Sequence, residues 1–195
     1  MRPHFDYSAR VRPCFGEAVS GDLAFVKADS RGLFAALVDV LGHGPEAHQV
    51  GRQVERLLER SWSPNLPEVA DAMNTHLKGT RGAAAGIAWM ERQSALVEFV
   101  GFGNVRIRRF GSQETRLSGR PGTLGEGRRT PRVERLQLHP GDVVLLYSDG
   151  VRDRFDITQY PQLLAHDPRA ITANMISRFG KEFDDASCIA VKYKE

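Results

Sequence analysis

Residues 32–46 constrain the fold of this chain more than any other stretch. Their sequence is GLFAALVDVLGHGPE, in which an apolar run ends in a carboxylate, Asp39, before a Gly-His-Gly turn and Pro45. Such a run is typical of a buried strand, and a charge at its buried end is costly unless a partner compensates for it. The central question for the rest of the sequence is therefore which groups compensate for Asp39.

The preceding segment places a second carboxylate beside the first. Residues 22–28 and 33–40 predict two strands joined by a turn-rich tetrapeptide, Asp-Ser-Arg-Gly. If the hairpin is symmetric, Asp22 lies directly opposite Asp39. Directly opposed side chains on antiparallel strands have Cβ atoms about 5 Å apart, and like charges at that distance repel. Two facing carboxylates at the end of an apolar hairpin therefore indicate a bound cation.

The remaining periodicity predicts strand-rich layers between helices in one domain, residues 1–195. Helices are expected at residues 45–61, at 67–77, and from Pro168 to Gly180 with Asp167 as the N-cap. Further strands are expected at residues 4–12, 83–91, 95–101, 104–110, 133–138, 143–147 and 186–193. The three strands within 83–110 are predicted to form an antiparallel meander, and the two within 133–147 a hairpin. A Gly-, Pro- and Arg-rich loop spans residues 118–132.

Composition excludes several classes of protein. With 195 residues, 41% of them hydrophobic, the chain can bury one sizeable core. No apolar run approaches the roughly 20 residues that a membrane span needs, and the first residues lack the apolar region of a signal peptide. Neither Cys14 nor Cys188 belongs to a CxxC pair, so buried free thiols in a reducing cytoplasm are expected in preference to a disulfide.

The net charge of +3 reflects two local groups of arginines: Arg106, Arg108 and Arg109 on one expected strand, and Arg128, Arg129 and Arg132 in the long loop. The favoured interpretation is solvated surface. The alternative is a docking surface for an acidic or phosphorylated partner. No helix-turn-helix, RNA-binding aromatic run or zinc spacing accompanies these arginines, so a nucleic-acid partner is not expected.

Four aspartates share one pattern, since each lies where an apolar strand begins or ends: Asp22, Asp39, Asp149 and Asp184, with Asp185 beside the last. Turn chemistry explains any one of them, but together they can converge along one edge of a sheet sandwich. Carboxylates without local cysteine or histidine ligands select hard ions such as Mg²⁺ or Mn²⁺ over Zn²⁺. Two such ions about 4 Å apart can clamp a phosphate and orient a bridging water, so direct hydrolysis is the expected chemistry.

Several motifs carry a family resemblance, and they fall in the family's order along nearly the whole chain. They are Ser20-Gly21-Asp22, Val38-Asp39-Val40-Leu41-Gly42-His43-Gly44, Gly122-Thr123-Leu124-Gly125, Pro140-Gly141-Asp142, Tyr147-Ser148-Asp149-Gly150-Val151 and Asp184-Asp185-Ala186-Ser187. With them the chain resembles the metal-dependent type-2C (PPM) protein phosphatases, in their compact SpoIIE/RsbU-like bacterial branch. Because it carries no sensor or kinase-like extension, it is most similar to the stand-alone phosphatases of stressosome signalling.

The resemblance implies an α+β fold, an αββα sandwich with two central antiparallel sheets, helices outside them and metals at one edge. It implies that Asp39 bridges two Mn²⁺ or Mg²⁺ ions and that the Val40 carbonyl completes one shell. Asp149 and Asp184 would bind the first ion, with Asp184 preferred over its neighbour Asp185, and Asp22 would contribute to the second. The implied reaction is attack of a metal-bridging water on phosphoserine or phosphothreonine in STAS-domain proteins of a cytoplasmic stress-signalling complex.

The sequence also departs from the family pattern. The acidic residue that the family places two or three positions beyond Asp22 is missing, since Leu-Ala-Phe follows, which predicts a weakly held second ion. Residues 119–125 match the family's loop only loosely, and its phosphate-binding arginine has no counterpart. His43 could protonate the leaving oxygen or stabilise its turn. Two further functions therefore stay open: a catalytically weak docking module in a signalling complex, and a phosphatase of small metabolites.

Overall fold

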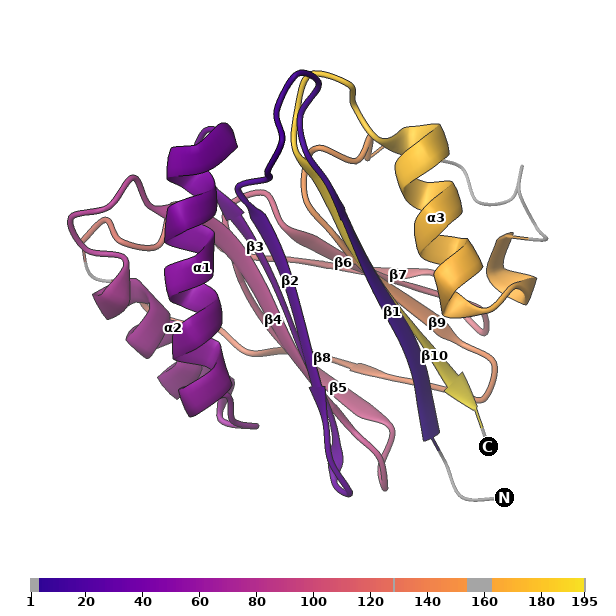
Figure 1. The fold of residues 1–195 in the computed structure, drawn as a ribbon. Helices are drawn as coiled ribbons and strands as arrows, with labels where there is room; N and C mark the ends of the chain where they lie inside the picture. The colour runs from indigo at the N-terminus through magenta and orange to yellow at the C-terminus, as the bar shows by residue number, and fades with distance from the viewer. Residues whose placement is uncertain (1–3, 128, 154–162, 195) are drawn as a thin grey trace.

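The computed structural model of the chain describes residues 4–127, 129–153 and 163–194, and two five-stranded sheets form its centre (Figure 1). One sheet has the order β1 (His4–Arg12), β10 (Ala186–Lys194), β9 (Val143–Tyr147), β6 (Arg106–Phe110) and β7 (Thr115–Ser118). The other has the order β2 (Asp22–Ala28), β3 (Gly32–Val40), β4 (Ala83–Glu91), β5 (Leu96–Phe102) and β8 (Glu134–Gln137). Neighbouring strands in both sheets are antiparallel.

Helices cover the outer faces of the two sheets. α1 (Gly44–Ser61) and α2 (Leu66–His76) lie over the sheet that contains β3 (Figure 1). A short 3-10 turn (Leu163–Ala165) and α3 (Pro168–Phe179) lie over the sheet that contains β1 and β10. Buried apolar clusters fill the spaces between helices and sheets and between the sheets themselves. This order of layers confirms the predicted αββα sandwich.

β2 and β3 form the predicted hairpin in the predicted register, with Asp22 opposite Asp39 at its open end. Asp29 fixes the turn, because its Oδ1 accepts hydrogen bonds from the backbone N–H groups of Arg31 and Gly32, at 2.8 and 3.1 Å. β3 also pairs with β4 along its other side, so it is an interior strand with apolar side chains buried on both faces. The buried environment inferred for the run before Asp39 is therefore present.

The predicted hairpin of residues 133–138 and 143–147 is wrong. β8 pairs with β5 in one sheet, whereas β9 lies between β10 and β6 in the other. Asp142 holds the crossing between the sheets, since its carboxylate accepts hydrogen bonds from the backbone N–H groups of His139 (2.9 Å) and Ser112 (2.7 Å). Both strands still bury apolar side chains between the sheets. The alternation of apolar and polar residues along these two strands is therefore the same whether they pair in a hairpin or belong to different sheets.

The predicted meander within residues 83–110 is correct for β4 and β5 and wrong for β6. β4 and β5 pair with each other, but the chain then turns at Gly103 and Asn104 into the opposite sheet, where β6 pairs with β7 and β9. This crossing brings Asn104 to the same end of the sandwich as Asp39, as the site below shows.

Arg108 and Arg109 of β6, which the sequence analysis assigned to solvated surface, are buried. Arg109 donates a hydrogen bond to the backbone oxygen of Gln137 in β8, so it links the two sheets. Arg108 forms an ion pair with Glu114, and its guanidinium lies 4.6 Å from the centre of the Phe110 ring. Burial of these two charges is possible because each has partners that the sequence alone does not reveal.

Other sequence predictions have simple outcomes. Cys14 and Cys188 are both free and buried, as expected. Asp167 caps α3 by accepting hydrogen bonds from two backbone N–H groups of the first turn, at 2.8 and 3.0 Å. Arg132 is exposed, while Arg128 lies outside the described residues. Among the helices that the structure describes, none is long and apolar enough to cross a membrane.

Candidate metal centre

The predicted aspartates lie at one edge of the sandwich, where strands of both sheets begin or end. In Figure 1 this is the upper edge, where the loop between β1 and β2 rises beside the loop that precedes β10. Asp22 and Asp39 belong to one sheet, and Asp149 follows β9 of the other. The backbone N–H of Ser148 donates to the oxygen of Ser187, at 3.1 Å, and so holds the end of β9 against the start of β10.

A buried hydrogen-bond chain connects the two sheets at this edge. The hydroxyl of Ser148 donates to Oδ2 of Asp22, at 2.7 Å, and its oxygen accepts from the backbone N–H of Ser187, at 3.1 Å. The backbone N–H of Asp22 in turn donates to the hydroxyl oxygen of Ser20, at 3.0 Å. Because Ser148, Ser187 and Asp22 are all buried, these bonds hold the Asp22 carboxylate in one orientation.

The aspartates raise one another's pKa values. The pKa of Asp39 is raised to about 8, first by burial and then by the charges of Asp22, Asp149 and Asp184, while a hydrogen bond from Asn104 opposes the rise. Burial also raises the pKa of Asp22 to about 7, against the hydrogen bonds from its serine neighbours. The pKa of Asp184 is raised by burial and by the charge of Asp149. The structure therefore brings all four predicted aspartates within electrostatic range of one another.

The donor chemistry at this edge fits a hard divalent cation. Carboxylates that repel one another are stabilised by a cation placed among them, and Oδ1 of Asn104, a neutral oxygen, is buried without a hydrogen-bond partner beside Asp39. Lys181 is 3.9 Å from Asp184 and is the cation that opposes the rise in its pKa. Among the described residues, no three Asp, Glu, His or Cys side chains are gathered closely enough to enclose an ion as they stand.

Backbone contacts fix two further residues of the predicted metal-ligand set, Val40 and Asp149. Val40 is the last residue of β3 and pairs with Ala83 of β4. Asp149 lies in the turn after β9, and this turn touches the segment before β10 so closely that a Cβ on Gly150 would lie 1.8 Å from the backbone oxygen of Asp185. Only glycine fits there, and this contact sets the position of Asp149 relative to Asp184.

Asp184 and Asp185 have different surroundings. Both carboxylate oxygens of Asp185 accept backbone hydrogen bonds, from Cys14 N–H and from Gly21 N–H, each at 2.7 Å. Asp185 is buried, and its contacts hold the loop between β1 and β2 against the start of β10. Asp184 is partly exposed at the same edge and faces Lys181. These contacts favour Asp184 over Asp185 as a ligand, in line with the sequence-based preference.

His43 contacts Glu17 and none of the predicted aspartates. Its Nδ1 lies 2.8 Å from Oε1 of Glu17, and the imidazole is exposed. The glycines on either side have φ values of +84° at Gly42 and +75° at Gly44, which is the left-handed conformation that glycine adopts without strain. The sequence left two roles open for His43, protonation of the leaving oxygen and stabilisation of its turn. The contact with Glu17 supports the second role.

Three contributors were missed by sequence reasoning: the hydroxyl of Ser148, the side chain of Ser187 and the amide of Asn104. Ser148 and Ser187 belong to the quoted motifs, but their hydrogen bonds to Asp22 depend on two strands from distant parts of the chain. Asn104 follows a glycine in a short connection between strands, a context in which asparagine is common as a turn residue. No local signal marks it as a neighbour of Asp39.

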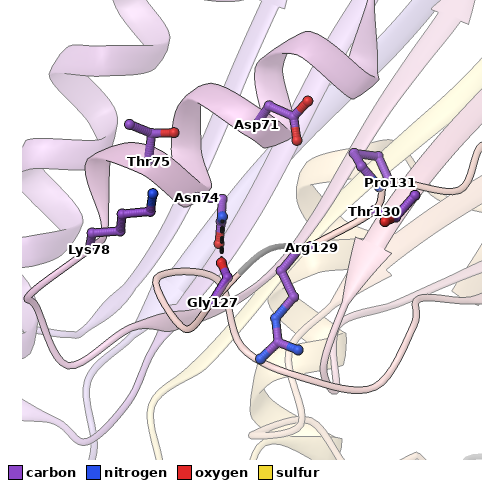
Figure 2. A pocket seen from close by; sticks show the side chains of 8 residues that line it. All are labelled: Asp71, Asn74, Thr75, Lys78, Gly127, Arg129, Thr130 and Pro131. Carbon is purple, nitrogen blue, oxygen red and sulfur yellow. Dashed lines mark hydrogen bonds between the residues drawn. The ribbon is translucent and has the colours of Figure 1, made fainter.

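A pocket of about 620 Å³ lies apart from this edge, between α2 and the loop that follows β7 (Figure 2). None of the predicted aspartates lines it. At its floor the side chain of Asn74 donates to the oxygen of Gly127, at 3.1 Å, and accepts from the N–H of Gly125, at 2.9 Å. Leu124 and Ala83 exchange backbone hydrogen bonds. Asn74 and β4 therefore hold the Gly-Thr-Leu-Gly segment in place, so its role in this structure is to shape the end of the sandwich.

This fold is that of the PP2C-type (PPM) phosphatases. A family model described as Stage II sporulation protein E (SpoIIE) matches residues 29–194, and the chain belongs to that family. A curated relative, "Phosphoserine phosphatase RsbX" of Bacillus subtilis (strain 168), is 31% identical over 92 residues, which are 47% of this chain and 46% of the relative. The match thus spans about half the length of that protein.

Two solved structures have the same fold over nearly the whole chain. One, described as "The bacterial stressosome: a modular system that has been adapted to control secondary messenger signaling", has a TM-score of 0.88 at 24% identity, covering 97% of this chain and 100% of that chain. The other, RsbX in complex with magnesium, has a TM-score of 0.83 at 20% identity, covering 98% of this chain and 96% of that chain. The predicted family and fold are confirmed.

Proposed function

We propose that this chain is a Mn²⁺- or Mg²⁺-dependent protein-serine/threonine phosphatase. The observation that carries the proposal is the facing pair of Asp22, which is buried, and Asp39, which is partly buried. Their pKa values are raised to about 7 and about 8, and Asp39 lies within electrostatic range of Asp149 and Asp184. Membership of the SpoIIE family, a relative named phosphoserine phosphatase and a magnesium complex of a protein with the same fold support it.

The predicted metal ligands would have different roles. Asp39 would hold both ions, and the Val40 carbonyl would complete one shell. Asp149 and Asp184 would hold the first ion, and Asp22 would contribute to the second. Bound Mn²⁺ or Mg²⁺ supplies Lewis acidity toward the phosphate and lowers the pKa of water, which permits direct hydrolysis without a protein nucleophile. Ser148 keeps the Asp22 carboxylate oriented and lowers its pKa. Asp22 and Asp39 must both lose their protons before they can act as ligands.

The substrates we propose are phosphorylated STAS-domain proteins of a stressosome-like complex in the cytoplasm. The similarity to RsbX and to a structure described under the bacterial stressosome supports this choice of partner. The match to the named relative covers 47% of this chain, and a phosphorylated STAS-domain protein is the substrate to assay.

A docking module with little catalytic activity is the second candidate. It is favoured by the three apolar residues that follow Asp22 in place of an acidic one, and by the absence, among the described side chains, of three ligands already gathered around one point. A chain of this kind would bind its partner without needing a divalent ion.

The decisive experiment measures phosphate release from a serine-phosphorylated STAS-domain protein, with Mn²⁺ and with EDTA. We expect release that requires Mn²⁺ and is lost in Asp39→Asn. Wild-type protein that releases no phosphate, or an Asp39→Asn variant that keeps full activity, would refute the phosphatase. Calorimetric titration with Mn²⁺ identifies the second candidate, since a docking module should show no binding event that Asp149→Asn abolishes. Free phosphoserine, assayed in parallel, separates a protein phosphatase from an enzyme of small metabolites.

A further inference from the structure

Two phenylalanine rings stand exposed together beside the aspartate edge. Phe15 is 78% exposed and Phe183 81%, the largest exposed fractions among the bulky apolar side chains that the structure describes. Their ring centres are 6.4 Å apart with an angle of 77° between the planes, and the backbone N–H of Phe15 donates to the oxygen of Glu182 at 2.8 Å. Both rings thus remain in water, although the backbone of Phe15 is held beside the segment that carries Phe183. Exposed aromatic side chains that lie together are a feature of interaction surfaces.

A pocket of about 440 Å³ lies between one ring of this pair, Phe183, and the aspartate edge. Phe183 and Asp184, which are neighbours in the chain, both line it, so an exposed ring and a predicted metal ligand share one pocket. Arg152, Lys181 and Glu182 complete the lining. A polypeptide bound with its phosphoresidue at Asp184 would therefore lie next to this pocket.

The cations of this pocket are positioned by the backbone. The N–H of Arg152 donates to the oxygen of Phe179, at 2.8 Å, and the N–H of Lys181 donates to the oxygen of Gly150, at 2.7 Å. The guanidinium of Arg152 is exposed and forms no hydrogen bond or ion pair with any described residue. Lys181, by contrast, already faces Asp184 at 3.9 Å. Among the described residues, Arg152 is thus the cation of this pocket whose side chain has no acidic partner.

We propose that Phe15, Phe183 and Arg152 form a docking surface for the phosphoprotein substrate, recognising an apolar side chain and an acidic side chain that flank the phosphoresidue. The apolar side chain packs on the two rings, and the acidic one pairs with Arg152. This inference rests on the proposed function, because it assigns a purpose to the pocket only if a phosphate is hydrolysed at the neighbouring aspartates. Its basis is the continuity of the surface with that edge and the charge of Arg152.

The test compares two substrates at saturating Mn²⁺: a serine-phosphorylated STAS-domain protein and p-nitrophenyl phosphate, which has no flanking polypeptide. The variants are Phe15→Ala, Phe183→Ala and Arg152→Glu. We expect each to lower the ratio of kcat/KM for the phosphoprotein to kcat/KM for p-nitrophenyl phosphate by about tenfold or more, through KM, as loss of an interface anchor does. The matched control is Tyr7→Ala, which removes a 45% exposed aromatic ring from β1 and should leave the ratio unchanged.

Several outcomes would overturn the docking surface. Equal losses on both substrates would make these residues part of the general chemistry, and an unchanged ratio in all three variants would remove them from recognition. A wild-type dimer that becomes monomeric in Phe15→Ala and Phe183→Ala, seen by sedimentation, would assign the rings to self-association. If the wild type hydrolyses neither substrate, the phosphatase proposal fails separately. The docking surface is then judged by calorimetric titration with the same phosphoprotein, where a Kd unaffected by the variants refutes it.

Discussion

Asp22 and Asp39 lie directly opposite each other across β2 and β3, at the end of a hairpin whose other paired residues are mostly apolar or buried. The pKa of Asp22 is raised to about 7 and that of Asp39 to about 8, in both cases mainly by burial. At neutral pH the pair is therefore partly protonated when no cation is present. The fold thus holds two groups in a position that disfavours their ionised forms, and a bound cation would reverse this preference.

Asp39→Asn should stabilise the protein in EDTA at pH 9 while it abolishes stabilisation by Mn²⁺. At that pH Asp39 is ionised against three other carboxylates, and the neutral amide of similar shape removes this repulsion. One pKa unit corresponds to about 1.4 kcal/mol, so we expect a gain of at least about 1 kcal/mol in the free energy of unfolding. Urea denaturation with EDTA and with Mn²⁺ measures both effects. A variant less stable than the wild type in EDTA would contradict this account of the pair.

The stability of the ion-free protein should fall as the pH rises from about 4 to about 8. The pKa values of Asp22 and Asp39 are raised from 3.8 to about 7 and about 8, so in this window the folded state keeps protons that the unfolded state has lost. Stability falls with pH wherever the folded state binds more protons, with a slope of up to about 1.4 kcal/mol per pH unit for each proton kept. Their contribution is fully present below pH 3.8 and is lost as the pH passes the folded-state values.

Urea denaturation in EDTA at several pH values measures this slope. Asp39→Asn is the matched control, because it lacks one of the two groups and should show a shallower fall. Saturating Mn²⁺ should remove the fall in the wild type, because binding of the ion displaces the protons. Equal slopes for wild type and variant would show that other groups dominate the titration.

Sequence reasoning succeeded where the deciding interactions are local. The Asp-Ser-Arg-Gly turn sets the register of β2 against β3, so the meeting of Asp22 and Asp39 could be predicted from position alone. It failed where a strand could join either of two sheets. The apolar and polar residues of β6, β8 and β9 alternate in the same way in either sheet, so their pattern does not identify the partner strands. Hydrogen-bond partners that lie far apart in the chain could not be predicted either. Examples are the backbone oxygen of Gln137 for Arg109 and the backbone N–H of Cys14 for Asp185.

Adjacent aspartates offer a direct comparison of ligand and structural roles. Asp185→Ala should lower the free energy of unfolding by about 2–5 kcal/mol, because it leaves two buried backbone N–H groups, of Cys14 and Gly21, without acceptors. Asp184→Ala, at a partly exposed position, should change stability by less than about 0.5 kcal/mol but weaken Mn²⁺ binding by tenfold or more. Urea denaturation in EDTA and calorimetric titration supply the two readouts. The reverse pattern would make Asp185 the ligand.

Gly150→Ala should destabilise the protein and weaken metal binding together. The added Cβ would lie 1.8 Å from the backbone oxygen of Asp185, so the turn that carries Asp149 must move away from β10. Overpacking of this kind costs about 1–3 kcal/mol. Gly51→Ala is the matched control, since its Cβ meets nothing closer than 3.4 Å and alanine favours the helix, so stability should stay the same or rise. Thermal unfolding with and without Mn²⁺ measures both, and equal behaviour of the two variants would argue against a close-packed turn.

Ser148→Ala should weaken Mn²⁺ binding in a pH-dependent manner. The Ser148 hydroxyl donates to Asp22 at 2.7 Å and lowers its pKa, so its removal raises that pKa further above about 7. At pH 7 a larger share of Asp22 is then protonated, and the ion has to displace that proton. We expect the Kd for Mn²⁺, from calorimetric titration, to rise by up to about tenfold at pH 7 and to approach the wild-type value at pH 9, where Asp22 is ionised in both proteins.

Two controls identify the cause of that loss. Ser20→Ala removes a hydroxyl that accepts from the backbone N–H of Asp22 and does not touch its carboxylate, so it should not shift the pH dependence. Asp22→Asn has no proton to displace at this position, so the pH dependence that its weakened binding keeps comes from Asp39 and should be shallower than in the wild type. If Ser148→Ala loses the same factor in affinity relative to the wild type at pH 7 and at pH 9, Ser148 acts by positioning Asp22 alone, and control of the Asp22 pKa is not its role.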